Sequence, residues 1–371
     1  MDASFRTLLN YGKYCRIWPY VDVDRKVLYV SVGLARPFRK PLCILLMSKD
    51  YGRSWDEIAD FYSVDKRNTT TGQPFVTDEG VILVPVWNAG FYTHGETWFA
   101  IYRSEDRGLS WKKVYEDPQG TYGNHFFQNS VNGSIFIGVG VAGGGSKGKV
   151  RYAPLKSYLL GSTDLGDTWG KVLEVDYPTA LYSGTTLDDQ TVLVAAREKR
   201  TVFRSSNGGD SWSEIPMGNK ARSVSYIKKL GKAVLTSNGC IFISDDGLKW
   251  VRLNSPIKEL ALRYPMLYGE KIYMTGVGWR SYVISTNLDK WYITFDVSKE
   301  SSNGFFLTRM AMMNDYVFLG DEVNGALLRL KPSVHNKGSI TTSQVVIFGV
   351  RYIISIAKYG MKRFLKQEMF P

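Results

Sequence analysis

Cysteine and histidine are scarce in this chain, and a long apolar run is absent. The 371 residues include three cysteines and three histidines. Cys15, Cys43 and Cys240 lie far apart and form neither a CxxC pair nor a Cys/His cluster, which argues against a disulfide framework and against a zinc site. No segment is long and apolar enough to span a membrane, and residues 1–13 lack the apolar core of a secretory signal. These absences favour a cytoplasmic or peripheral membrane protein.

Acidic residues are outnumbered by basic ones. With 47 Lys and Arg against 35 Asp and Glu, the net charge is +12 and the pI is about 9.3. Such a balance favours polyanionic partners, namely acidic polysaccharide, anionic lipid or nucleic acid, although it can also serve solubility alone. No recognisable motif supports specific nucleic-acid binding. A hydrophobic content of 44%, with 14% aromatic residues, argues against a disordered chain.

One eight-residue pattern, S-x-D-x-G-x-[ST]-W, recurs along the chain and predicts its architecture. Full copies begin at Ser48, Ser104, Ser162 and Ser205, and two worn copies begin at Ser244 and Ser285. Each copy follows a short apolar run, which is typical of the turn of a β-hairpin. The Asp or Asn can accept hydrogen bonds from turn N–H groups, and the Gly permits positive φ. A calcium loop would need a further bidentate Glu, which no copy carries.

The spacing of the copies predicts a repeat protein. The copies begin roughly 40–60 residues apart, close to the length of a four-strand propeller blade. A seventh unit without the motif follows, so we expect an all-β, seven-bladed β-propeller over residues 1–348, with six blades as the alternative. Residues 341–348 would supply the outer strand that closes the ring. Inserted loops at 87–96 and 138–156 are expected on the face opposite the motifs, where they would build a binding surface.

Residues 349–371 read as a basic amphipathic helix. Apolar residues recur with helical spacing at Val350, Ile353, Ile354 and Ala357, and lysines and arginines fall largely away from that stripe. The helix could dock on the propeller, bind an anionic membrane surface or meet a partner protein.

Several side chains that could act in catalysis or bind an anion are expected where the inner strands of the blades begin or their second strands end. The candidates for catalysis are His125, Tyr182 and Glu198, with His125 and Tyr182 level on neighbouring blades. An imidazole titrates near neutrality and can act as an acid or a base. Guanidinium groups suit a planar anion, so the candidates for substrate binding are Arg16, Arg197, Arg263, Arg309 and His94. Strand-end arginines can also simply solvate a rim. No residue pattern suggests a metal or a cofactor.

The repeated motif resembles the Asp-box of sialidases and related β-propellers, over nearly the whole chain. That family includes glycoside hydrolases, seven-bladed polysaccharide lyases and non-catalytic assembly factors. Sialidases carry an Arg-Ile-Pro element before the first box; in this chain Arg16-Ile17-Trp18-Pro19 is interrupted by Trp18, which disfavours a true sialidase. The lyases use His and Tyr as base and acid and an Arg to neutralise a uronate carboxylate, roles that the resemblance would give to His125, Tyr182 and one of Arg16, Arg197 or Arg263.

Two functions remain open from the sequence. The first is recognition, and cleavage by a hydrolase or lyase reaction, of an acidic carbohydrate or other anionic ligand on the loop-rich face. The second is a non-catalytic propeller that docks a protein partner or an anionic membrane surface.

Overall fold

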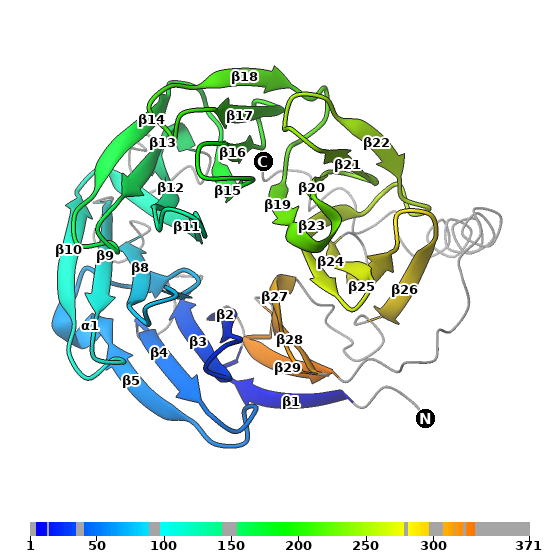
Figure 1. The fold of residues 1–371 in the computed structure, drawn as a ribbon. Coiled ribbons are helices and arrows are strands. Elements are labelled where there is room, and N and C mark those ends of the chain that lie inside the picture. The colour runs from blue at the N-terminus through cyan, green and yellow to red at the C-terminus, as the bar shows by residue number, and fades with distance from the viewer. Residues whose placement is uncertain are drawn as a thin grey trace, which may run out of the picture.

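The protein is a ring of seven β-sheets. The computed structural model describes residues 5–12, 15–34, 41–88, 97–142, 154–277, 281–296, 307–314, 316–321 and 324–330. Within these ranges, seven antiparallel sheets stand around a common axis as the blades of a propeller (Figure 1). The prediction of an all-β fold with seven blades is therefore confirmed, and the six-bladed alternative is wrong.

The first six blades follow one another along the chain, and within each blade the chain runs from the inner to the outer strand. Blade 1 consists of β2 (Cys15–Asp22), β3 (Val27–Leu34), β4 (Cys43–Ser48) and β5 (Asp56–Asp60). Blade 2 consists of the short strands β6 (Thr70–Thr71) and β7 (Phe75–Val76), then β8 (Ile82–Asn88), β9 (Trp98–Ser104) and β10 (Lys112–Asp117). Blade 3 consists of β11 (Gly120–Gln128), β12 (Ile135–Ala142), β13 (Pro154–Ser162) and β14 (Gly170–Val175). Blade 4 consists of β15 (Leu181–Thr186), β16 (Val192–Ala196), β17 (Thr201–Ser205) and β18 (Ser213–Pro216). Blade 5 consists of β19 (Ser223–Ile227), β20 (Lys232–Thr236), β21 (Cys240–Ser244) and β22 (Val251–Asn254). Blade 6 consists of β23 (Ala261–Tyr268), β24 (Lys271–Val277), β25 (Ser281–Thr286) and β26 (Trp291–Asp296).

Blade 7 combines the two ends of the described chain. Its strands are β27 (Leu307–Met313), β28 (Tyr316–Asp321) and β29 (Ala326–Leu330), followed at the rim by β1 (Phe5–Asn10). Short helical turns occur at α1 (Phe61–Val64) and η1 (Lys228–Leu230). In the described ranges no helix has the length and apolar character needed to cross a membrane.

The hydrophobic core lies between neighbouring blades. One cluster joins Tyr29 and Leu45 of blade 1 to Ile82 and Val84 of blade 2. Because the middle strands are covered by a blade on each side, they are largely apolar, and all five residues of β16 are buried. The outer strands face solvent on one side and carry charged residues such as Lys112.

Each copy of the repeated motif connects the third strand of its blade to the outer strand. In the copy at blade 2, Ser104 Oγ donates to Asp106 Oδ1 at 2.8 Å, and the backbone N–H groups of Gly108 and Ser110 donate to Ser104 Oγ and Asp106 Oδ1. Gly108 has φ +91°, and a Cβ there would lie 2.8 Å from Ile58 Cδ1 of the preceding blade. The turn is therefore held closed internally and packed against its neighbour.

Ring closure differs from the expected arrangement. The outer strand of blade 7 is β1, which pairs antiparallel with β29 from Phe5 opposite Leu330 to Asn10 opposite Ala326 (Figure 1). The expectation that residues 341–348 would fill this place is wrong, because the hydrogen-bonding edge of β29 is already occupied. Residues 341–348 and the predicted helix at 349–371 lie outside the described residues.

We expect removal of residues 1–10 to destabilise the ring and promote self-association. The deletion leaves the edge of β29 unpaired, at a cost on the order of 1 kcal/mol for each backbone hydrogen bond lost. Thermal unfolding and light scattering should show a lower Tm and larger particles. A chain lacking residues 350–371 is the comparison, and an unchanged monomeric species with a native Tm after the N-terminal deletion would contradict the role of β1.

We expect the aspartates of the repeated motif to make stability fall in acid. Hydrogen bonds from Ser110 and Ser104 lower the pKa of Asp106 to about 2, whereas an aspartate in the unfolded chain has a pKa of about 3.9. The unfolded chain therefore binds this proton first, and the free energy of unfolding should fall as the pH drops from about 4 to about 2.

The fourth copy of the motif supplies the control for this acid dependence. Asn207 makes the same turn with an amide, accepting from the N–H of Ser211 at 3.0 Å and donating to its hydroxyl at 2.9 Å. Asp106→Asn should therefore be nearly neutral at pH 7 and should reduce the loss of stability in acid, as measured by urea unfolding across that pH range. An Asp106→Asn variant with an unaltered acid profile would rule out this explanation.

Candidate functional site

The candidate residues gather at one face of the ring, which we call the top face. Because the strands of each blade are antiparallel, this face carries the starts of the inner strands, the ends of the second strands and the connections between blades. The copies of the repeated motif lie at the opposite face.

Irregularities in the inner strands occur at the candidate side chains. The pairing register shifts between Gly123 and Phe126, between Leu181 and Ser183, between Arg263 and Met266, and between Leu307 and Met310. The residues inside these shifts include His125, Tyr182, Tyr264 and Arg309. A β-bulge breaks the alternation of side chains and redirects them, and bulges are common beside functional sites.

Tyr264 is held in an unusual backbone conformation. Its φ is +54°, which L-residues other than Gly, Asn and Asp seldom adopt. The backbone N–H of Tyr264 donates to Ser223 Oγ of blade 5 at 2.7 Å, and this contact holds the conformation in place. Pro265 follows and has no N–H to offer to the sheet.

A hydrogen bond spans the centre of the ring. His125 Nε2 of blade 3 and the Tyr264 hydroxyl of blade 6 are 3.2 Å apart, and Trp18 of blade 1 packs edge-on against the imidazole with ring centroids 5.5 Å apart. Burial, together with the positive charge of Arg309, holds the pKa of His125 well below its usual value. The imidazole is therefore neutral at pH 7, the form that can accept a proton.

Arg309 brings a positive charge into the same group. Its guanidinium lies 5.0 Å from the centre of the Tyr264 ring, and burial lowers its pKa to about 10. Three buried polar atoms of this group, Trp18 Nε1, His125 Nδ1 and Arg309 Nη1, make no hydrogen bond to any part of the chain that the structure describes. Buried polar groups are rarely left unpaired, so this cluster is suited to receive a hydrogen-bond acceptor from outside the chain.

A second group lies beside it, where β16 ends. Arg197 stacks over the Tyr182 ring, 4.4 Å from its centroid, and its Nε donates to Glu198 Oε1. The other carboxylate oxygen of Glu198 accepts from the backbone N–H of Ala180 at 3.1 Å. Glu198 is thus engaged on both oxygens, and Tyr182 is covered by a guanidinium.

Positive charge accumulates around Tyr182. Burial and the neighbouring Arg263 and Arg197 lower the pKa of Arg222 to about 10, while Tyr182 and Glu198 oppose that change. The guanidinium groups of Arg197 and Arg263 therefore lie near enough to act on Arg222, and the carboxylate of Glu198 acts on it in the opposite sense. We call these three arginines with Tyr182 and Glu198 the arginine cluster.

The structure groups the predicted site residues differently from the sequence analysis. Tyr182 lies against Arg197, and the hydroxyl that meets His125 belongs to Tyr264, which was not predicted. Pro265 is the signal that could have revealed it, because proline inside a strand often marks a bulge. Arg16 lies at the start of β2 opposite Gly33, and His94 lies outside the described residues. Within those residues, no three His, Cys, Asp or Glu side chains form a group able to hold a metal ion.

Comparison with known proteins supports the fold. No family model and no curated protein sequence matches the chain. Among solved structures, virginiamycin B lyase from Staphylococcus aureus aligns with a TM-score of 0.62 at 10% identity, over 90% of this chain and 100% of that one. YCF48 bound to a D1 peptide aligns with a TM-score of 0.54 at 13% identity, over 90% and 96% of the two chains. At such identities the likeness concerns the propeller fold alone.

We expect His125 to make the protein less stable as the pH falls below about 6.5. The unfolded imidazole takes up a proton near that pH, whereas the buried one resists protonation, so unfolding binds a proton. Urea unfolding between about pH 8 and 5 should show this loss, and His125→Gln should reduce it. A His335→Gln variant is the control. Stability that rises as the pH falls would contradict a neutral, buried His125.

Proposed function

We propose that this propeller recognises an acidic carbohydrate at the centre of its top face. The observation that supports this best is the arginine cluster: Arg197 bonds Glu198, whose other oxygen accepts from Ala180, and both Arg197 and Arg263 lower the pKa of Arg222. Positive charges that disfavour one another's charged form, as those acting on Arg222 do, favour the addition of an anion. Guanidinium forks match the planar geometry of a carboxylate, and the ligand carboxylate is assigned to this cluster.

Aromatic side chains beside the cluster support a ring-shaped ligand. Tyr182 and Trp18 are only partly buried and can offer an apolar surface next to the charged groups. We further assign the repeated turn to the Asp-box of sialidase-like propellers, on the strength of its Ser, Asp, Gly and Trp positions. The family that this turn resembles includes glycoside hydrolases and polysaccharide lyases as well as non-catalytic assembly factors, so the turn is compatible with the proposed ligand but does not select it.

We further propose that the centre of the top face catalyses an elimination reaction, because it contains a base, a cation and a proton donor. A neutral His125 would take the proton α to a uronate carboxylate while an arginine neutralises that carboxylate. The bond to the leaving oxygen then breaks, and a tyrosine hydroxyl, Tyr264 or Tyr182, supplies the proton that this oxygen needs. If the reaction were hydrolytic, Glu198 would be the first carboxylate to replace. One structural neighbour is itself a lyase, but the low identity transfers only its fold.

The alternative is a non-catalytic propeller that docks a protein or an anionic membrane. The YCF48 structure with its bound peptide illustrates a propeller of this fold that binds a protein segment. Acidic side chains of a partner would then occupy the arginine cluster. Membrane contact through residues 349–371 is a separate proposal, since those residues lie outside the described ones.

A panel of acidic polysaccharides and sialosides, with carboxyl-reduced forms as matched neutral ligands, tests the proposal. Binding should require the carboxylate and weaken with salt. New ultraviolet absorbance from unsaturated uronates would identify a lyase, and reducing ends without that absorbance would identify a hydrolase. Failure to bind any acidic glycan, together with capture of an acidic peptide, would favour the docking alternative.

Arg263→Gln should weaken binding of the acidic ligand at least about tenfold, because a charge-assisted hydrogen bond contributes roughly 1.5–3 kcal/mol. Arg53→Gln is the matched control: Arg53 is exposed in the repeated motif at the opposite face. Calorimetric titration of both variants measures the difference. Equal losses in the two variants would mean that overall charge, and not the arginine cluster, attracts the ligand.

A further inference from the structure

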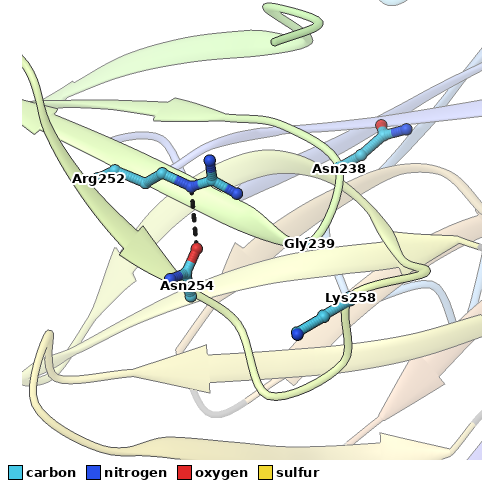
Figure 2. Close-up of a pocket in the computed structure, with 5 residues that line it drawn as sticks. All are labelled: Asn238, Gly239, Arg252, Asn254 and Lys258. Carbon is cyan, nitrogen blue, oxygen red and sulfur yellow. Dashed lines mark hydrogen bonds between the residues drawn. The ribbon is translucent and has the colours of Figure 1, made fainter.

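A pocket on the top face lies between blades 5 and 6, outside the groups described above. It has a volume of about 390 Å³ and is lined by Asn238, Gly239, Arg252, Asn254 and Lys258 (Figure 2). Asn238 and Gly239 form the turn between β20 and β21, Arg252 and Asn254 belong to β22, and Lys258 lies on the connection to blade 6. The volume is within the range of small-ligand sites.

The pocket wall is rigid because its two loops are bonded to each other. The N–H of Gly239 donates to the carbonyl of Leu260 at 2.8 Å, and the N–H of Ser255 donates to the carbonyl of Gly239 at 2.8 Å. Gly239 has φ +62°, and a Cβ at this position would lie 2.4 Å from the Lys258 carbonyl oxygen. Only glycine permits this approach, and the backbone of the two loops is held in place before any ligand arrives.

The lining is cationic and carries no carboxylate. Arg252 Nε donates to Asn254 Oδ1 at 2.9 Å, which fixes the arginine in the wall (Figure 2). Neither Arg252 nor Lys258 takes part in an ion pair with any residue in the described ranges. Two cations and two amides around a preformed space suit a compact oxyanion, a carboxylate or a sulfate group.

One side chain connects this pocket to the arginine cluster. Arg222 Nε donates to Asn238 Oδ1 at 2.6 Å, so the amide that lines the pocket also holds a guanidinium of the cluster. Two anion-binding positions are thereby fixed next to each other across blades 4 to 6.

We propose that the pocket is a second anion subsite, and that the ligand is a linear polyanionic saccharide and not a single acidic sugar. The arginine cluster takes the carboxylate of one sugar residue, and Arg252 and Lys258 take the carboxylate or sulfate of another residue along the chain. The saccharide part of this inference rests on the proposed function, whereas the anion site does not.

Inorganic sulfate tests the anion site by itself. Calorimetric titration, with chloride at equal ionic strength as the blank, should show saturable binding to the wild type. Binding should be at least about tenfold weaker in Arg252→Gln/Lys258→Gln. Lys249→Gln, an exposed lysine of the same blade at the opposite face, is the control and should bind like the wild type. No saturable binding, or equal binding by the double variant, overturns the subsite.

Uronate oligosaccharides of increasing length test the polymer. The double variant should bind a trisaccharide at least about tenfold more weakly than the wild type and a monosaccharide equally well, since the monosaccharide needs only the arginine cluster. An equal loss for both lengths would overturn the assignment of the pocket to a second sugar residue. Sulfate binding that depends on Arg252 and Lys258, without binding of any uronate, would keep the anion site and overturn the saccharide.

Discussion

The pairing of β1 with β29 is the contact on which the rest of the structure depends. Every blade packs its inner surfaces against two neighbours, so no blade is complete until the ring is closed. The repeated turn supports this arrangement locally: its Ser and Asp close the hairpin, and its Gly allows the turn to approach the preceding blade. The stability of each blade is therefore partly a property of the next one, and the seam in blade 7 holds the whole set together.

The centre of the ring combines this rigidity with local departures from regular structure. Bulges in four inner strands bring polar side chains of different blades together, and the positive φ of Tyr264 is held by the hydrogen bond that its N–H donates to Ser223 of the preceding blade. Unpaired buried donors and adjacent guanidinium groups carry a cost in the isolated chain. Contacts between neighbouring blades elsewhere in the ring offset that cost in the free protein, and a ligand that supplies anionic acceptors would remove it.

The fold could be predicted from the sequence far better than the site. Copies of the motif reveal the hairpins directly, and even the seventh blade, which has none, shows three recognisable apolar strands. The partner of β29 could not be predicted, because strand pairing across the ends of a chain leaves no trace in local spacing. His125 and Arg309 were found from their places at inner strands, whereas Tyr264 was missed. The bulge between Arg263 and Met266 breaks the alternation of side chains, so counting along the strand does not reveal that Tyr264, and not Tyr182, meets His125.

The position of β1 also affects the order in which the blades can fold during synthesis. This strand is made before every other described element, yet its partner β29 is the last of them to be made. Blades 1 to 6 can form in order during synthesis, each packing on the one before. The backbone groups of β1 stay unpaired until β29 has been made. The contact between His125 and Tyr264 likewise needs blades on opposite sides of the ring. A binding-competent centre therefore belongs only to molecules whose synthesis has passed blade 7, and an interrupted chain would remain an open arc.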